Sequence, residues 1–163
     1  MSKENLDRNI CCPEFDPTLW DEKIFEWSNK KFIRESVFTF FYVPIGFGKA
    51  MKRLDETITL VNAKNSQAMC LSDHTSIWNM DLYLAVDKEI PNAKNTTLSG
   101  TYVSKVYEGS FNETGKWQKD FTVWHTTQGH EIVKQLMWYT TCPKCAKKYG
   151  KNYVVILAEI EKL

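Results

Sequence analysis

Two cysteines separated by two residues, Cys142 and Cys145, are the first feature of the sequence that could carry chemistry. A structural zinc site needs four cysteine or histidine ligands, because tetrahedral coordination closes all four positions. The chain contains one such pair, so Cys11 or Cys12 would have to complete the set. Zinc is therefore one alternative. We predict that the protein has no metal or other cofactor.

The same pair could also act as a reactive or redox-sensing dithiol. Such a pair needs its first cysteine at the N-terminus of a helix that follows a strand, where the helix dipole lowers the thiol pKa. The lysines that follow would favour a thiolate, but the βαβ surroundings of a thioredoxin-type couple are missing. We predict that residues 142–152 form a loop between the last two strands, with its turns set by Pro143 and Gly150.

Carboxylates are the second group of candidates. Side chains alternate along residues 77–87, which places Asp81 on the opposite face from Met80 and Leu82. A carboxylate in an apolar cleft can anchor an organic cation or act as a general base toward water. Asp81 is the first candidate and Glu108, beside Gly109 at a strand end, is the second. The alternatives are a strand residue bonded to a neighbouring amide or lysine for Asp81, and a solvated turn residue for Glu108.

Aromatic residues are the third group, with six tryptophans and seven tyrosines in 163 residues. Aromatic faces bind planar or cationic ligands through stacking and through the ring quadrupole. Trp117 and Trp124 have helical spacing and are assigned to the core. The predicted ligand-binding residues are Trp78, Asp81, Tyr83, Tyr102, Glu108, Trp138 and Tyr139.

Composition and charge exclude several classes of function. The formal net charge is +1, and lysines alternate with acids, which argues against binding to a nucleic-acid backbone. No apolar run approaches the roughly 18 residues of a spanning helix, and the N-terminus lacks a signal-peptide core, so we expect a cytoplasmic protein without a membrane partner. No nucleophile elbow, phosphate loop or HExxH zinc motif is present.

The elements that must position these residues follow the same order twice. A Val- and Phe-rich strand ends at Pro44, an amphipathic helix runs from Phe47 to Val61, and two strands follow, joined by a turn at LSDHTS. The second half repeats this order, with a helix that ends near Gly129. We predict an α+β domain of tandem βαββ repeats, about 31–91 and 96–161, in which both helices lie on one side of an antiparallel sheet. Residues 1–30 form an arm that packs on the domain through aromatic anchors.

One stretch also resembles a known family. The run LSGTYVSKVYEGSFNETGKWQKDFTVW, residues 98–124, resembles the opening of the second repeat in the GyrI-like effector-binding family, of the SOUL/GyrI type. The segments CPEFDPTLWD, WNMDLYLAV and WYTTCPKCAKKYGKNYVVILA are similar to a small subfamily of stand-alone bacterial proteins with this fold. The resemblance implies a tandem βαββ fold with an aromatic-lined cleft between the repeats that binds small, often cationic or planar, organic molecules.

The resemblance also carries functional alternatives. Some members of the family sense effectors for transcription regulators, and related stand-alone proteins resemble hydrolases of reactive small molecules. No helix-turn-helix segment accompanies the repeats, so direct DNA contact is not expected. The family often has an acid on the last strand, and here the acid of that strand is Glu159, near its end.

The sequence thus predicts a small-molecule binding protein with an aromatic cleft and an acidic anchor. The first alternative is a hydrolase that uses the same carboxylate, Asp81 or Glu108, to activate water. The second is an interaction protein that depends on zinc or on the thiols of the CPKC segment.

Overall fold

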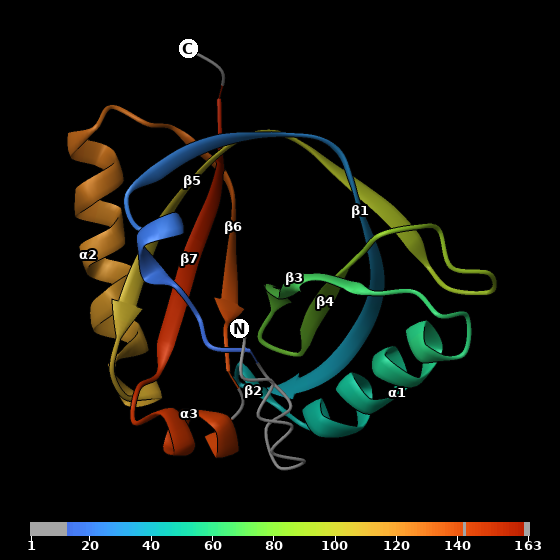
Figure 1. Ribbon diagram of the computed structural model, residues 1–163. Coiled ribbons are helices and arrows are strands. Elements are labelled where there is room, and N and C mark those ends of the chain that lie inside the picture. Colours follow the sequence, from blue (N-terminus) through green and yellow to red (C-terminus); the bar gives the residue numbers. More distant parts are fainter. Residues whose placement is uncertain (1–12, 142, 162–163) are drawn as a thin grey trace, which may run out of the picture.

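The computed structural model describes residues 13–141 and 143–161 of the chain (Figure 1). In chain order the elements are η1 (Pro17–Leu19), β1 (Lys23–Phe40), β2 (Val43–Pro44), α1 (Phe47–Thr59), β3 (Asn65–Ser76), β4 (Asn79–Val86), β5 (Asn95–Glu108), η2 (Phe111–Glu113), α2 (Thr114–Thr127), β6 (Ile132–Tyr139), α3 (Pro143–Tyr149) and β7 (Tyr153–Ile160). None of the helices in this part of the chain is long and apolar enough to cross a bilayer.

The order of elements confirms the predicted α+β fold with two βαββ units. The first unit is β1, α1, β3 and β4, and the second is β5, α2, β6 and β7. Each strand pairing between these elements is antiparallel. Figure 1 shows α1 and α2 on the outside of the sheet, one from each unit.

The sheet closes on itself because β1 pairs on both of its edges. Residues 32–38 of β1 pair with β4, whereas residues 23–33 pair with β5. The strand order is therefore a ring, β1-β4-β3-β6-β7-β5, that returns to β1, with β2 attached at the far end of β1. A bulge between Trp27 and Lys30, with Asn29 at a positive φ, bends the strand within the part that pairs with β5. The predicted sheet face that lies opposite the helices is thus the inside of a barrel.

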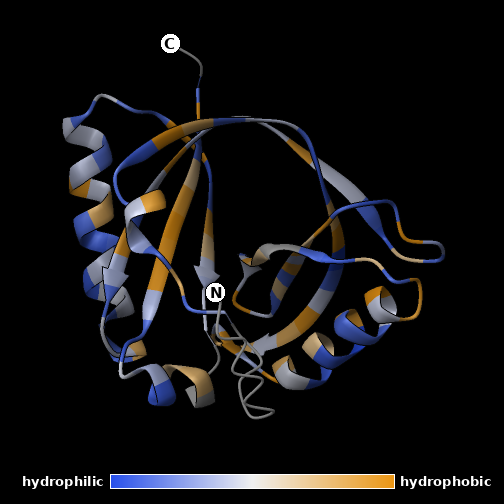
Figure 2. Cartoon of the chain, viewed as in Figure 1, coloured by the Kyte–Doolittle hydropathy of each residue, from blue (hydrophilic) through white to orange (hydrophobic). Residues whose placement is uncertain are grey.

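Alternation along the strands divides the core into an inner and an outer part. Leu82 and Leu84 of β4 face outward and pack with Leu54 of α1, while Tyr83 and Ala85 face inward. This is the alternation that the sequence predicted for β4. The strand β7 is hydrophobic on both faces and is largely orange in Figure 2, as expected for a strand covered on both sides.

The two outer helices bury residues at four-residue spacing. Leu54 and Ile58 of α1 pack on the first unit, and Trp117 and Phe121 of α2 pack on the second. Trp117 is buried, as predicted, whereas Trp124 is only half-buried at the edge of the same cluster.

The boundaries of three segments differ from those predicted. β1 begins at Lys23, so residues 23–30 of the expected arm belong to the sheet, with Phe25 and Trp27 packed on the inner cluster. The LSDHTS segment lies within β3 and not in a turn, because its residues pair with β4. Residues 143–149 form α3 and not a loop; the fixed φ of proline suits a first helical turn, and Gly150 follows with φ +69°.

The packing of α2 on the barrel can be tested with one buried and one exposed residue of the same helix. Replacing the fully buried Phe121 by alanine leaves a cavity, and we expect it to lower the free energy of unfolding by about 3–5 kcal/mol. Val123→Ala, at a side chain that is 66% exposed, should change it by less than about 0.5 kcal/mol. Urea denaturation measures both, and equal losses would contradict the packing described.

Candidate functional site

A cavity of about 680 Å³ opens between the segment that precedes β1, the first part of β1, and the ends of β3 and β6. The preceding segment contributes Phe15 and Trp20, β1 contributes Phe25 and Trp27, and β6 contributes Trp138. Because β3 belongs to the first unit and β6 to the second, the cavity lies at the junction of the two repeats.

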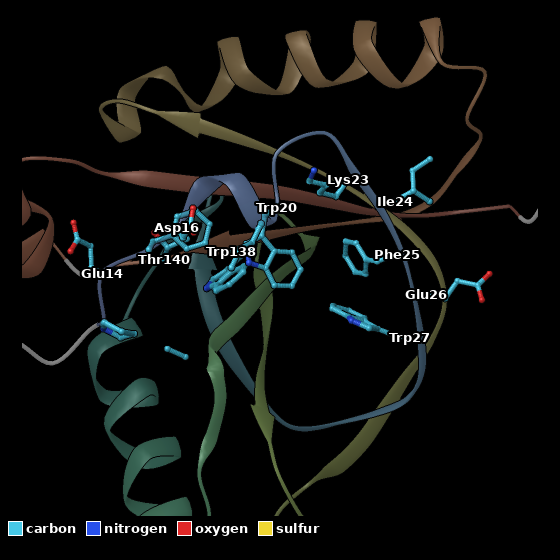
Figure 3. Close-up of a pocket in the computed structure, with 14 residues that line it drawn as sticks. Glu14, Asp16, Trp20, Lys23, Ile24, Phe25, Glu26, Trp27, Trp138 and Thr140 are labelled. Carbon is cyan, nitrogen blue, oxygen red and sulfur yellow. The ribbon is translucent and has the colours of Figure 1, made fainter. Parts of the chain in front are cut away.

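Aromatic rings form the wall of this cavity, and they meet mainly edge to face. Trp20 contacts Trp138 and Phe25 with centroid distances of 5.2 and 5.4 Å, and both pairs are nearly perpendicular. Phe15 approaches Trp138 from the other side at 5.3 Å. Figure 3 shows the rings of Trp20, Phe25, Trp27 and Trp138 turned toward one another. Edge-to-face geometry is preferred for aromatic pairs, so the wall is a specific arrangement.

The alternation of β1 decides which of its side chains face the cavity. Phe25 and Trp27 point inward, and Figure 3 shows Glu26 directed away from them. Trp27 continues the aromatic wall into the barrel, because its ring lies 4.6 Å from that of Tyr102. Lys30 also contacts Trp27: its Nζ lies over the indole ring, 5.6 Å from the ring centroid.

Hydrogen bonds hold the segment before β1 in place over the barrel. The Ser104 hydroxyl donates to the Trp20 carbonyl, and the Val106 amide donates to Asp21 Oδ1 at 3.1 Å. Asp16 caps η1 by accepting from both the amide and the hydroxyl of Thr18. These bonds fix Phe15 and Trp20 at the cavity although neither belongs to the sheet.

The rim of the cavity is more acidic than basic. Glu14, Asp16 and Glu26 line it together with Lys23. The hydrogen bonds from Thr18 lower the pKa of Asp16 below its ordinary value. A negative rim around an apolar, aromatic interior favours an organic cation over an anion.

Three of the predicted ligand-binding residues share the inner face of the barrel. Tyr83, Tyr102 and Trp138 all belong to the inner cluster, and Trp138 lines the cavity. Burial, with smaller contributions from Glu159 and Tyr83, raises the pKa of Tyr102 to about 12. The indole Nε1 of Trp138 is buried and has no hydrogen-bond partner among the described residues. A ligand atom that accepted a hydrogen bond from this N–H would offset the cost of burying an unpaired donor.

Asp81 also faces inward but lies away from the cavity lining. It is 9% exposed, and its Oδ1 accepts hydrogen bonds from Ser36 at 2.7 Å and from the Asn79 amide at 3.1 Å. The carboxylate is thus held in place by two neutral donors and not by a cation.

The structure does not bring the other predicted residues into this site. Glu108 is the last residue of β5 and is exposed. Trp78 is 46% exposed and contacts aromatic residues near the end of β1. Tyr139 lies on the outer face and contacts Phe111. Glu159 lines a second hollow of about 640 Å³, which it shares with Trp27.

Sequence reasoning missed a polar group on the inner face. Lys134 Nζ lies 3.2 Å from Asp73 Oδ2 and 3.4 Å from the Tyr83 hydroxyl, and 5.0 Å from the centre of the Tyr83 ring. Burial disfavours the charged lysine, but the hydrogen bonds and charge of Asp73 and Tyr83 outweigh it and raise the pKa of Lys134. The sequence predicts Asp73 in a turn and Lys134 outside any strand, so no sequence pattern connects the two residues.

The cysteine motif can be described only in part. Cys142, Cys11 and Cys12 lie outside the described residues, and Cys145 is buried in α3. Within the described ranges no three or more His, Cys, Asp or Glu side chains come together as a metal site. The zinc and dithiol alternatives therefore stay predictions.

Comparison with known proteins shows the family to which the chain belongs. The chain belongs to the family described as bacterial hydrolase, whose model matches residues 2–160. No curated protein matches the sequence. The GyrI-like resemblance is not established by this family match and stays a prediction.

Solved structures share the fold at low identity. The cryo-EM structure of the EcmrR–DNA complex in EcmrR-RPo matches 90% of this chain, with 10% identity and a TM-score of 0.68. The match covers 59% of the EcmrR chain. The crystal structure of the EcmrR C-terminal domain matches over 99% of its length and 89% of this chain, with 12% identity and a TM-score of 0.65. SAV2435 bound to tetraphenylphosphonium matches over 94% of its length and 86% of this chain, with 12% identity and a TM-score of 0.53. At these identities the likeness shows the fold alone.

The inner ion pair provides a test of this geometry. Asp73→Asn leaves the half-buried Lys134 without its counter-charge, and we expect a loss of about 1–3 kcal/mol in the free energy of unfolding together with a lower Lys134 pKa. Glu22→Gln is the matched control, because Glu22 is a more exposed carboxylate 3.8 Å from Lys105 and should contribute less than about 1 kcal/mol. Urea denaturation and NMR titration of labelled lysines measure both. Equal losses in the two variants would contradict a buried role for Asp73.

Proposed function

We propose that this protein binds a small organic cation with aromatic or planar groups in the cavity at the repeat junction. The observation that carries the proposal is the aromatic wall, in which Phe15, Trp20, Phe25, Trp27 and Trp138 converge from separate parts of the chain. Concave sites lined mainly by apolar and aromatic side chains with a few polar groups are typical of small-molecule sites.

The volume and the charge of the site support the same class of ligand. About 680 Å³ falls within the range of ordinary small-molecule pockets. The indole and phenyl faces attract a cation through their quadrupoles, and the acidic rim adds a longer-range attraction. Further support comes from SAV2435, which shares the fold and whose structure contains the lipophilic cation tetraphenylphosphonium.

The acidic anchor has two possible positions, which predict different results. Asp81, the first candidate from the sequence, is buried and held by Ser36 and Asn79. Glu14 lies at the rim of the cavity, and Glu26 lies at its edge with the side chain directed away from the rings. We favour the rim acids as the source of charge selectivity, because they lie beside the aromatic wall, and we retain Asp81 as a deeper anchor to be tested against them.

The aromatic wall is tested by titrating the protein with tetraphenylphosphonium in a calorimeter. Trp20→Leu removes a ring that contacts both Trp138 and Phe25, and we expect the Kd to rise about tenfold or more. Trp124→Leu is the matched control, because Trp124 is also partly buried and in aromatic contact but lies on α2, so its Kd should change by less than about twofold. Absence of binding to the unmodified protein, or equal effects of the two variants, would contradict the proposal.

The source of the charge is tested with the same probe. Glu14→Gln combined with Glu26→Gln removes two rim charges, and we expect weaker binding whose remaining affinity depends less on salt. Asp81→Asn removes one inward charge outside the cavity lining and should leave both the Kd and its salt dependence unchanged. If Asp81→Asn abolishes binding while the rim variant does not, the sequence-based anchor is correct and the rim assignment is wrong.

Hydrolysis is the second candidate function, and the family description favours it. Its chemical basis would be Asp81 as a general base, which takes a proton from a water molecule that attacks an ester or another reactive carbonyl. Incubation with a panel of aryl and cationic esters, followed by mass spectrometry, separates the two functions. Hydrolysed product that disappears in Asp81→Asn supports this mechanism, whereas recovery of each probe intact contradicts it.

A further inference from the structure

The turn that joins β1 to β2 carries a cluster of exposed aromatic residues that the proposed site does not use. Phe38, Phe40, Phe41 and Tyr42 are each more than half exposed, and Trp78 packs beside the first three with centroid distances between 5.3 and 6.5 Å. Val43 and Ile45 extend the exposed apolar surface along the chain, at 63% and 56%. A contiguous exposed apolar patch of this kind marks an interaction surface.

The backbone of this turn is strained at its most exposed residues. Phe40 pairs with Val43, so Phe41 and Tyr42 alone form the connection, and both have positive φ values of 46° and 68°. Asparagine and glycine adopt this conformation readily, whereas a bulky residue there costs free energy. The placement of two large rings at strained positions, where they face solvent, is not explained by folding stability. Strain of this kind is found where exposed side chains have a binding role.

The chain segment next to the patch carries lysines. Residues 36–54 contain Lys49, Lys52 and Arg53 and no acidic residue. Arg53 pairs with Glu35 and Lys52 lies 3.9 Å from Glu56, so Lys49 is the cation of this segment for which no ion pair is described. Lys49 and Lys52 are exposed at the beginning of α1. Figure 1 shows α3, with the exposed Lys147 and Lys148, at the same end of the molecule as β2 and the beginning of α1.

A second copy of the chain fits this surface less well than a lipid surface does. β2 is at the edge of the sheet, but it consists of Val43 and Pro44, and proline has no amide to donate to another strand. The patch is centred on the two-residue turn of a hairpin, which hydrogen-bonds to the neighbouring β3–β4 turn through the Tyr42 amide and the Ile77 carbonyl. Aromatic rings at such a turn, next to lysines, match the chemistry of a bilayer interface with anionic headgroups.

We infer that the β1–β2 turn docks this protein onto an anionic lipid surface, with Phe40, Phe41, Tyr42 and Trp78 entering the interface and Lys49 and Lys52 contacting headgroups. This contact is peripheral and needs no spanning helix; it departs from the sequence-based prediction of no membrane partner, which no finding tests. It rests on residues outside the aromatic cavity and does not depend on the proposed ligand-binding function.

The test is co-sedimentation of the full chain with two kinds of vesicle. One contains phosphatidylcholine alone, and the other contains phosphatidylcholine with about 30% of the anionic lipid phosphatidylglycerol, which gives it a negative surface. We expect binding to the anionic vesicles that falls as salt is added and is weak with the neutral vesicles. Phe41→Asn combined with Tyr42→Gly removes two rings while fitting the positive φ values, so the melting temperature should hold or rise. We expect this variant to partition about tenfold less.

Two further variants separate the contributions to docking. Lys49→Glu combined with Lys52→Glu should remove the preference for anionic vesicles while the turn stays intact. Val123→Ser, at an equally exposed apolar residue on α2, should leave partitioning unchanged. Sedimentation with neither vesicle type, equal binding to both, or unchanged binding of the turn variant would overturn the inference. A concentration-dependent dimer that the turn variant abolishes would assign the patch to a second copy instead.

Discussion

The fold depends on one long strand that hydrogen-bonds along both edges. β1 supplies partners for β4 in its second part and for β5 in its first part, and this joins the two βαββ units into a closed ring. Two three-stranded sheets side by side would each leave an apolar face to solvent, which small sheets do not tolerate well. Closure turns those faces into a common interior that can be lined with rings. The bulge between Trp27 and Lys30 bends β1 within its pairing with β5, just before Phe32 and Ile33, which pair on both edges of the strand.

The interior is filled unevenly, and this unevenness produces the site. Toward the middle of the barrel Met69, Leu71, Leu136 and Leu157 pack tightly and are fully buried. Toward the arm the residues become larger, half-buried and aromatic, and the space between them remains open. Trp138 belongs to both regions, since it packs with the inner cluster and forms a wall of the cavity. A ligand in this cavity would therefore contact Trp138, whose ring also packs in the core between the two repeats.

The sequence predicts the repeated fold well because the fold depends on local periodicity. Leu54 and Ile58 of α1, Phe121 of α2 and the alternation of β4 all follow spacing rules that need no knowledge of partners. The site depends on contacts between residues that are far apart, so it was found only in part. Trp138 and Tyr102 were chosen as aromatic strand residues and do face inward. Tyr139 meets the same criterion but lies on the outer face, because residue type alone does not say which side of a strand is closed. Trp78 lies in the turn between β3 and β4.

The residues that pattern reasoning missed are those whose role comes from tertiary contact. The sequence predicts Phe25 and Trp27 in an arm, and it does not predict the contact of Lys134 with Asp73, because that contact depends on the pairing of β3 with β6.

The most direct measurement of the central claim is a crystal structure of the protein grown with tetraphenylphosphonium. We expect the phosphonium among the rings of Trp20, Phe25, Trp27 and Trp138, with Phe15 still in contact with Trp138. A cation bound elsewhere, or a cavity that stays empty at saturating ligand, would contradict this claim.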